Sequence, residues 1–388
     1  MRRLLEESFR AAVAAADPLV ILSGHLPPRP RGKVLVAAAG KAAASMALAV
    51  EREWGEVEGI AITRYGHGLP TKHIRVVEAG HPVPDEAGEH AAREILESAK
   101  RLAADDLLLV LISGGGSSLL SLPAPGVSMA ELKALTGKLL KSGAEIREMN
   151  TVRKHLSAIA GGRLAAACPG KVLALIISDV VGDDPTHIAS GPCAADPTTI
   201  DDAKAVLAKY RIAFDGPFSE SPKSTTATNK VIATAYKSLE AAAAVFRRAG
   251  YRPEILGDTI TGEAREVGKA MAQKALRTTG PAALISGGEC TVTIEGEGGR
   301  GGRCAEFLLS LGVETGGIWA IAADTDGIDG SEDNAGAILT PDSMTKGVDG
   351  KAFLAKHDSY GFFQQLGDLV VTGPTRTNVN DYRAILIL

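Results

Sequence analysis

Two segments of the sequence end an apolar run with the same five residues, Leu-Ile-Ser-Gly-Gly, at 111–115 and 284–288. Glycines allow a backbone to turn several N–H groups toward one anion, and serines add uncharged donors. The first copy gives a set of candidate substrate- or phosphate-binding residues: Ser113, Gly114, Gly115, Gly116, Ser117 and Ser118. No lysine follows the last glycine, so this is not a Walker loop. A tight turn at a close strand–helix contact explains the glycines equally well.

Lysine and arginine side chains accompany three further glycine or helix-start segments. Lys41 follows the strand-like run 33–40, and we expect it in the first turn of a helix, where the macrodipole disfavours a cation. A bound anion would remove this conflict, although a solvated surface lysine is the alternative. Arg153 is predicted near the start of another helix, capped by Asn150 or Thr151. The same conflict therefore arises there.

Arg303 and Arg300 stand among five glycines at 296–302. A guanidinium matches two phosphate oxygens at once, and glycines permit close approach of a ligand. A surface hairpin with solvated arginines is the alternative interpretation.

Carboxylates follow two of the apolar runs. Asp179 and Asp184 come after the run 171–178, and Asp324, Asp326 and Asp329 follow a later one. Mg²⁺ prefers one or two carboxylates together with phosphate oxygens, so Asp179 and Asp184 are candidate metal ligands. For each aspartate taken singly, turn formation is the better explanation.

The elements that must position these residues are short apolar runs that alternate with alanine-rich helical segments. Strands that are apolar on both faces belong to parallel sheets covered by helices, so the fold class is α/β. Residues 214–226, rich in proline, serine and glycine, interrupt the pattern. We therefore expect two domains: a Rossmann-like α/β domain at 1–221 and a smaller mixed α/β domain at 222–388.

Composition excludes several classes of function. The chain is 45% hydrophobic and 23% charged, with net charge −4, no basic block and few aromatic residues, so we expect no nucleic-acid partner. No apolar stretch is long enough for a membrane span, and Glu6, Glu7 and Arg10 interrupt any secretory signal. The four cysteines form no C-x-x-C pair, which favours the cytoplasm. A monomer and a homo-oligomer both stay open.

Gly296, Gly298 and Gly301 fit the dinucleotide pattern G-x-G-x-x-G. We give this match little weight, because the preceding "TVTIE" alternates polar and apolar residues as an edge strand does. The residues "SGGE" are expected to form a hairpin turn that joins "AALIS" to "TVTIE". The helix after the glycines is expected to be short.

As a set, the motifs resemble the glycerate 2-kinase family, the two-domain type with a C-terminal MOFRL module. The motifs are "GKAAASMA", "GHPVPDE", "LISGGGSSLL", "NTVRKHLSAIAGGRLA", "LIISDVVGDDPTHIASGP", "SGGECTVTIEGEGGRGGR", "DTDGIDG" and "GDLVVTGPTRTNVND". The resemblance implies transfer of a phosphoryl group from ATP to glycerate, with Mg²⁺, in a cleft between the domains. It also implies that Lys41 and Arg303 are an electropositive catalytic pair, and we expect Glu289 to help to hold the metal or orient the substrate.

Three residues depart from the family pattern. Cys304 and Ala305 replace an Asn-Gln pair that usually follows the arginine, and Arg376 replaces a small residue. The lost amide pair beside Arg303 bears on substrate preference and rate, and Arg376 offers a new contact for an anion. Two other functions stay open: a hydroxypyruvate reductase that binds NAD(P)H through the 296–301 glycines, and a non-catalytic protein that binds sugar acids.

Overall fold

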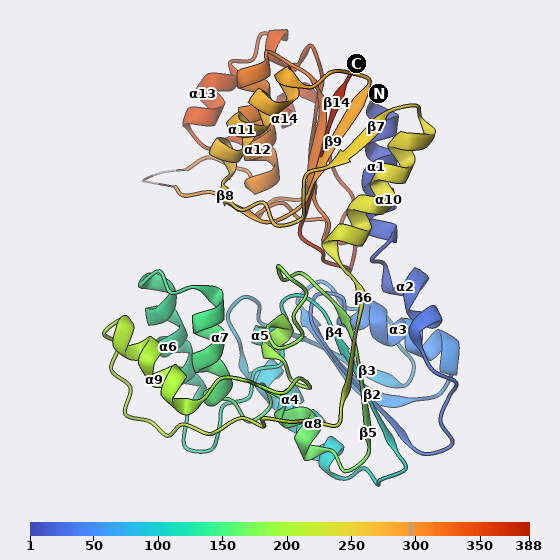
Figure 1. Cartoon of the computed structure of the whole chain (residues 1–388), viewed down its shortest axis with the longest axis vertical. Coiled ribbons are helices and arrows are strands. Elements are labelled where there is room, and N and C mark those ends of the chain that lie inside the picture. Colours follow the sequence, from blue (N-terminus) through green and yellow to red (C-terminus); the bar gives the residue numbers. More distant parts are fainter. Residues whose placement is uncertain (295, 297) are drawn as a thin grey trace. The chain divides into compact units, whose positions relative to one another are not determined.

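The computed structural model describes residues 1–294, 296 and 298–388, and these divide into two compact units (Figure 1). One unit comprises Ile21–Ile232 and is called the parallel-sheet unit below. The other comprises Met1–Val20 together with Ala233–Leu388 and is called the mixed-sheet unit. The chain is thus α/β throughout, as predicted.

The parallel-sheet unit is built on a six-stranded sheet in the order β3-β2-β1-β4-β5-β6. Its strands are β1 (Val34–Ala39), β2 (Glu58–Arg64), β3 (Ile74–Ala79), β4 (Leu107–Ile112), β5 (Lys171–Ile177) and β6 (Thr228–Ala233). β1 pairs in parallel with both β2 and β4, and β4 pairs in parallel with β5. Every residue of β1 and β4 is buried, as expected for strands that are apolar on both faces. The chain reverses its winding direction between β1 and β4, which is the position where doubly wound folds bind ligands.

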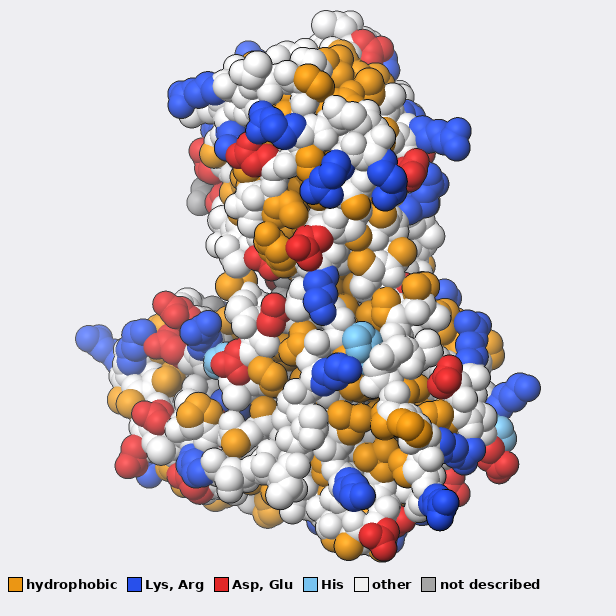
Figure 2. Space-filling view, turned by 45° about the vertical axis from the view of Figure 1, so that its right-hand side comes forward, with side chains coloured by type: hydrophobic (Ala, Val, Ile, Leu, Met, Phe, Trp, Pro, Cys, Tyr) orange, Lys and Arg blue, Asp and Glu red, His pale blue; other side chains and the backbone are white. Residues whose placement is uncertain are grey.

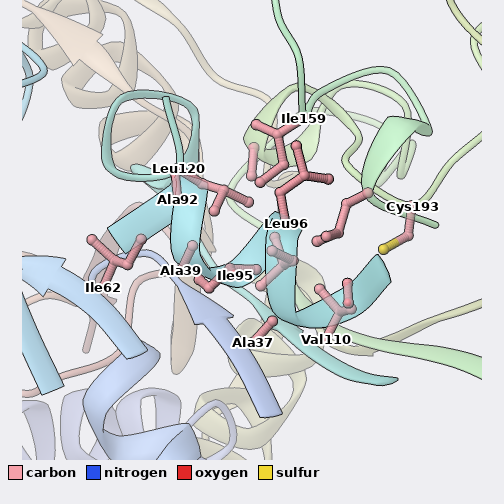
Figure 3. Packing of buried hydrophobic residues seen from close by; sticks show 14 of the residues in the cluster. Ala37, Ala39, Ile62, Ala92, Ile95, Leu96, Val110, Leu120, Ile159 and Cys193 are labelled. Carbon is pink, nitrogen blue, oxygen red and sulfur yellow. The ribbon is translucent and has the colours of Figure 1, made fainter. Parts of the chain in front are cut away.

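Several helices of this unit pack on the sheet. From α2 (Pro18–Ile21), which leads into the unit, the helices in chain order are η1 (Leu22–His25), α3 (Ala43–Trp54), α4 (Glu86–Lys100), α5 (Gly116–Leu119), α6 (Met129–Lys141), α7 (Ile146–His155), α8 (Arg163–Ala167), η2 (Ile188–Ser190) and α9 (Ile200–Lys209). Figure 3 shows Ile95 and Leu96 of α4 close to Ala37, Ala39 and Val110 of the sheet, within one buried cluster. α3 packs on β1 and β2 and buries Met46, Val50 and Trp54, the stripe that helical spacing predicts.

Helices α6, α7 and α9 form a cluster of their own, built on residues such as Leu135, Val152 and Leu207. The expected start of α7 at Asn150 or Thr151 is wrong. The helix begins at Ile146, after a capping box formed by Glu145 and Glu148. Arg153, Lys154 and His155 therefore lie in its last turn, where the macrodipole favours cations.

The mixed-sheet unit has a six-stranded sheet in the order β13-β12-β11-β14-β9-β7. The strands of this unit are β7 (Arg252–Ile255), β8 (Gly262–Glu263), β9 (Ala282–Ser286), β10 (Cys290–Thr291), β11 (Trp319–Asp324), β12 (Gly336–Leu339), β13 (Leu369–Val370) and β14 (Asp381–Ile387). β7 and β9 are parallel, whereas β14 runs antiparallel to both β9 and β11. The prediction of a second, mixed α/β domain is therefore confirmed.

Helices cover both faces of the mixed sheet. They are α1 (Arg2–Ala14), α10 (Ala235–Arg248), α11 (Ala264–Arg277), α12 (Arg303–Thr315), η3 (Ser343–Thr345), α13 (Gly350–Ala355) and α14 (Ser359–Leu366). One face packs on α11, α12 and α14, and the other on α1 and α10. α1 lies beside α10 (Figure 1), and its Leu5 and Phe9 are buried against that face.

These contacts explain why the compact units differ from the expected division at Ser221. Without α1, one apolar face of the mixed sheet would lose part of its cover, so the first residues of the chain fold with the last ones. An amphipathic helix at a chain start gives no sequence signal of which sheet it covers. The second change of unit comes at Ile232–Ala233, at the end of β6.

Two expectations around residue 290 are wrong. β10 does not form a hairpin with β9 but pairs in parallel with β8 in a small separate sheet, while β14 and β7 flank β9. The helix after the glycines, α12, is not short but spans thirteen residues and is buried along most of its length. Residues 295 and 297 of the glycine segment lie outside the described residues.

The surface carries mixed charge. On the face in Figure 2, lysine and arginine side chains are interspersed with aspartate and glutamate, and no large patch of one sign is visible. In the described part of the chain, no helix combines the length and the apolar character that crossing a bilayer requires. The four cysteines are free thiols, and three of them are buried.

Candidate active site

The loops after β1 and β4 meet at the point where the parallel sheet reverses its winding. The Lys41 amide donates to the carbonyl of Gly114 over 2.8 Å, and the Ala42 amide donates to the Ser113 hydroxyl over 2.9 Å. Lys41 lies just before the N-cap residue of α3, rather than in the first turn as predicted. The structure thus brings Lys41 and the 113–118 loop together, as expected if both contact the same ligand.

The 113–118 loop presents free backbone donors. Among the described residues, no hydrogen-bond acceptor faces the amides of Gly114 and Gly115. Gly115 has φ +81°, and a Cβ at this position would lie 2.8 Å from His81 Nε2. The position therefore needs glycine both for its backbone conformation and for the close approach of His81. Free amides in such a turn form a site for an anion.

Arg153 reaches this loop from the last turn of α7. One terminal nitrogen of its guanidinium donates to the Ser117 carbonyl over 2.9 Å. Burial lowers the pKa of Arg153, and in the part of the chain that the structure describes no carboxylate compensates its charge. A partly buried arginine with no carboxylate partner among the described residues is suited to receive an anionic ligand.

Two residues that the sequence analysis did not single out also lie at this loop. The Ser190 hydroxyl is 2.9 Å from the Ser117 hydroxyl and 3.4 Å from Asn150 Oδ1. Ser190 has φ +59°, in a turn that only the fold reveals. His81 lies against Gly115, and its only sequence signal was its place in the motif "GHPVPDE".

Lys154, the neighbour of Arg153, has a structural role. Its ammonium is buried and donates to Asp196 Oδ1 over 2.6 Å. Burial alone would raise the pKa of Asp196, but hydrogen bonds from Lys154, Ser221 and Thr198 lower it to about 2. This ion pair fixes the end of α7, and thereby the position from which Arg153 reaches the loop.

The two predicted metal ligands follow β5. Asp184 Oδ1 accepts from the Thr186 amide over 2.9 Å, which is the turn-forming role expected of an isolated aspartate. Burial opposes ionisation of Asp184, but hydrogen bonds from Thr186 lower its pKa. Within the described residues, no group of three or more metal-binding side chains converges. Asp179 and Asp184 follow β5, the strand paired with β4, and two carboxylates suit Mg²⁺, which takes its other ligands from phosphate and water.

Arg303, the first residue of α12, lies at one end of the central strands β11 and β14 of the mixed sheet. Its Nε donates to Asp381 Oδ1, and a terminal nitrogen donates to Asp324 Oδ2, each over 2.7 Å. Asp324 ends β11 and Asp381 begins β14, and the two residues are register partners in the antiparallel pair. The buried carboxylates therefore fix the direction of the guanidinium.

Glu289 is the third carboxylate at Arg303. Its Oε1 lies 3.1 Å from the other terminal nitrogen, and its side chain is 54% exposed. Burial alone would lower the pKa of Arg303, but Asp381, Asp324 and Glu289 together raise it well above its usual value. Since the exposed partner is the easiest to displace, a ligand oxygen could replace Glu289 while the two buried aspartates stay in place.

Asp381 was missed by the sequence analysis. It stands in "NVND" directly before the last apolar run, and this strand-start position was its only signal. Asp381 also accepts from the buried Arg383 over 2.6 Å, and Arg383 donates to the Gly287 carbonyl over 3.0 Å. Arg383 of β14 thus connects the second Leu-Ile-Ser-Gly-Gly copy, through Gly287, to Asp381, which binds the Arg303 side chain.

The residues that depart from the family pattern have different surroundings. Cys304 and Ala305 are fully buried in the cluster beneath α12, so apolar side chains suit these positions. Burial raises the pKa of the Cys304 thiol well above its usual value. Arg376 has φ +59°, in the left-handed region.

Comparison with known families and structures covers most of the chain. Residues 4–219 match a family described as a domain of unknown function, DUF4147, and residues 282–381 match the MOFRL family. A glycerate 2-kinase of Pyrococcus horikoshii is 41% identical over 97% of this chain and 94% of its own. The chain belongs to the glycerate 2-kinase family.

One solved structure and one further relative are also similar to this chain over most of its length. The crystal structure of a glycerate kinase from Thermotoga maritima matches with a TM-score of 0.90 and 38% identity, over 100% of this chain and 99% of that one. A protein of Agrobacterium vitis, provisionally named a hydroxypyruvate reductase, is 52% identical over 100% of this chain and 94% of its own. The names of the relatives thus include both enzyme classes considered above.

Proposed function

We propose that this protein is an ATP-dependent glycerate 2-kinase, which transfers the γ-phosphoryl group of ATP to the 2-hydroxyl of glycerate. The observation that carries the proposal is the pair of free amides at Gly114 and Gly115 in the 113–118 loop, which lies beside Lys41 and beside Arg153, a cation with no carboxylate partner among the described residues. A carboxylate and a phosphate chain both need such donors. The named glycerate kinases among its relatives support the same conclusion.

Each residue has a proposed role in phosphoryl transfer, a reaction that needs alignment of two oxygens and neutralisation of spreading negative charge. The 113–118 loop and Arg153 receive the glycerate carboxylate or a nucleotide phosphate. Lys41 contacts the transferring phosphoryl group. Arg303 exchanges the exposed Glu289 for a phosphoryl oxygen while Asp324 and Asp381 keep its orientation.

Asp179 and Asp184 would hold Mg²⁺ together with phosphate oxygens. The ion would neutralise charge on those oxygens. Asp184 keeps one carboxylate oxygen for the Thr186 turn, which fixes its position. Because the reaction consumes ATP and the four cysteines are unpaired, we also propose that the protein acts in the cytoplasm.

The reductase alternative depends on the glycines at 296–301. In a dinucleotide-binding fold these glycines join the first buried strand of a parallel sheet to a helix. Here the preceding strand is β10, which in the described part of the chain pairs with β8 in a two-stranded sheet separate from the main one. The observed strand pairing therefore favours the kinase.

Phosphorus NMR tests the proposed function. We expect glycerate, ATP and Mg²⁺ to give 2-phosphoglycerate and ADP in equal amounts. Oxidation of NADH by hydroxypyruvate without consumption of ATP would instead establish the reductase. A rise in melting temperature with glycerate but no turnover would establish a binding protein.

A further inference from the structure

The helix that begins with Arg303 is capped by a residue distant in the sequence. Its N-cap residue, Gly302, has no side chain to accept from the first amides. Asp329 takes this role: Oδ1 accepts from the Cys304 amide over 2.9 Å, and Oδ2 accepts from the Ala305 amide over 2.8 Å. A Cβ at Gly302 would lie 2.2 Å from Asp329 Oδ1, so only glycine allows this approach.

Asp329 is itself held firmly. It is 0% exposed, and its amide donates to the Asn334 carbonyl over 2.7 Å. The two amides that it binds belong to the residues directly after Arg303. Asp324 and Asp381 therefore orient the guanidinium of Arg303, whereas Asp329 fixes the backbone from which that side chain extends.

We propose that Asp329 is a positioning residue for Arg303, and that its ionised carboxylate holds the first turn of α12 in the geometry required for phosphoryl transfer. This inference rests on the role proposed above for Arg303. The carboxylate accepts from two amides at once, whereas a protonated carboxyl group has less acceptor capacity. Protonation would thus loosen the turn without removing any side chain.

The charges around Asp329 make its protonation accessible. Asp381 of β14 and Arg303 of α12 face it with opposite signs, while Glu332 and Asp333 of its own loop bind Arg300 and Tyr360. Burial, which the two amide bonds offset only in part, raises the pKa of Asp329 to about 7. The group therefore changes its charge within the range in which a kinase can be assayed.

The test compares kcat of the wild type and Asp329→Asn from pH 5.5 to 8.5. Asparagine has the shape of the protonated carboxyl group but cannot ionise. We expect the variant to be about 10- to 100-fold slower at pH 8, as for a small misplacement of a catalytic group, with KM nearly unchanged. The ratio of the two kcat values should approach one as the pH falls through about 7, since ionisation of the substrates cancels in the ratio.

Asp349→Asn is the matched control, because Asp349 also accepts from two amides, those of Lys351 and Ala352 at the start of α13. We expect it to keep the wild-type kcat at every pH. In an Arg303→Ala background, Asp329→Asn should cause no further loss of kcat. A further loss there, or a ratio that does not vary with pH, would show that Asp329 is merely structural and would overturn the inference.

Two other results are also decisive. If Arg303→Ala keeps the wild-type kcat, the proposed role of Arg303 is refuted. If Arg303→Ala loses kcat but Asp329→Asn keeps the wild-type kcat at pH 8, only the role of Asp329 is refuted. Should Asp329→Asn fail to fold, amide NMR of the wild type replaces it. The Cys304 and Ala305 amide signals should then titrate with the same apparent pKa as kcat, and signals that do not move would overturn the inference.

Discussion

Arg153 and Arg303 differ in how the surrounding residues compensate their charge. In the parallel-sheet unit, Arg153 donates to the Ser117 carbonyl, and among the described residues no carboxylate compensates its charge. In the mixed-sheet unit, Arg303 contacts Asp324, Asp381 and Glu289. Arg153 thus has a charge that an anionic ligand would compensate, whereas carboxylates of the chain already hold Arg303 in place.

This difference suggests a division of labour. A partly buried cation without a carboxylate partner contributes most to binding of the ground state, because the ligand supplies the missing charge. A cation oriented by fixed carboxylates contributes most where charge develops during the reaction, since it need not reorganise. We therefore expect Arg153 to determine KM for the acceptor and Arg303 to determine kcat.

Removal of the oriented cation should give the largest effect. Arg303→Ala and Lys41→Ala should each lower kcat by about a thousandfold or more, as loss of a charge-stabilising cation does in other phosphoryl transferases. Arg300→Ala is the matched control, because Arg300 binds Glu332 and lies over the Tyr360 ring instead. It should stay within a fewfold of the wild type in the coupled ADP assay. Equal losses at Arg300 and Arg303 would contradict the assignment.

The two units should differ in how pH affects their stability. The pKa of Asp329 is about 7 in the folded protein and about 3.9 when unfolded, so its contribution to stability falls as pH rises from about 4 to 7. Relative to Asp329→Asn, the wild type should be more stable at pH 5 than at pH 8 by on the order of 3 kcal/mol. Urea unfolding measures this difference.

Asp196→Asn is the control from the parallel-sheet unit. The pKa of Asp196 is lowered to about 2, so its contribution is present above about pH 4 and is lost only as pH falls toward 2. The stability difference between this variant and the wild type should therefore be the same at pH 5 and pH 8. A large change between these pH values would contradict the charge states assigned to the two units.

Loss of the uncompensated cation should mainly weaken acceptor binding. Arg153→Ala should raise KM for glycerate about 10- to 100-fold, the value of a hydrogen bond to a charged group, with a small change in kcat. Arg147→Ala, which removes an exposed arginine of the same helix, should leave KM unchanged. A loss confined to kcat would place Arg153 with the reacting phosphate instead.

Binding of inorganic phosphate should distinguish the Arg153 site from the Arg303 site, and of these predictions it has the smallest expected effect. At several times its dissociation constant it should stabilise the wild type by about 1 kcal/mol in thermal unfolding. This stabilisation should disappear in Arg153→Ala and persist in Arg303→Ala, because free phosphate must displace Glu289 to reach Arg303, whereas no carboxylate of the described residues competes at Arg153. The reverse pattern would contradict the comparison.

Local patterns in the sequence predicted the α/β class, the strands β1, β4, β5 and β9, and the meeting of Lys41 with the 113–118 loop. The end of a strand can be predicted well, because an apolar run and the glycines after it are adjacent in the sequence. The cover of the mixed sheet by α1 and the capping of α12 by Asp329 depend on contacts between distant residues. The start of α7 at Ile146 was missed because Glu145 is an unusual N-cap residue.

The most direct test of the division of labour is acceptor preference, measured as kcat/KM for glycerate divided by that for glyceramide, its neutral amide. The account predicts that the ratio falls about 10-fold or more in Arg153→Ala. It also predicts that the ratio keeps its wild-type value in Arg303→Ala, although both kcat values fall. An unchanged ratio in Arg153→Ala, or a collapse in Arg303→Ala, would contradict the account.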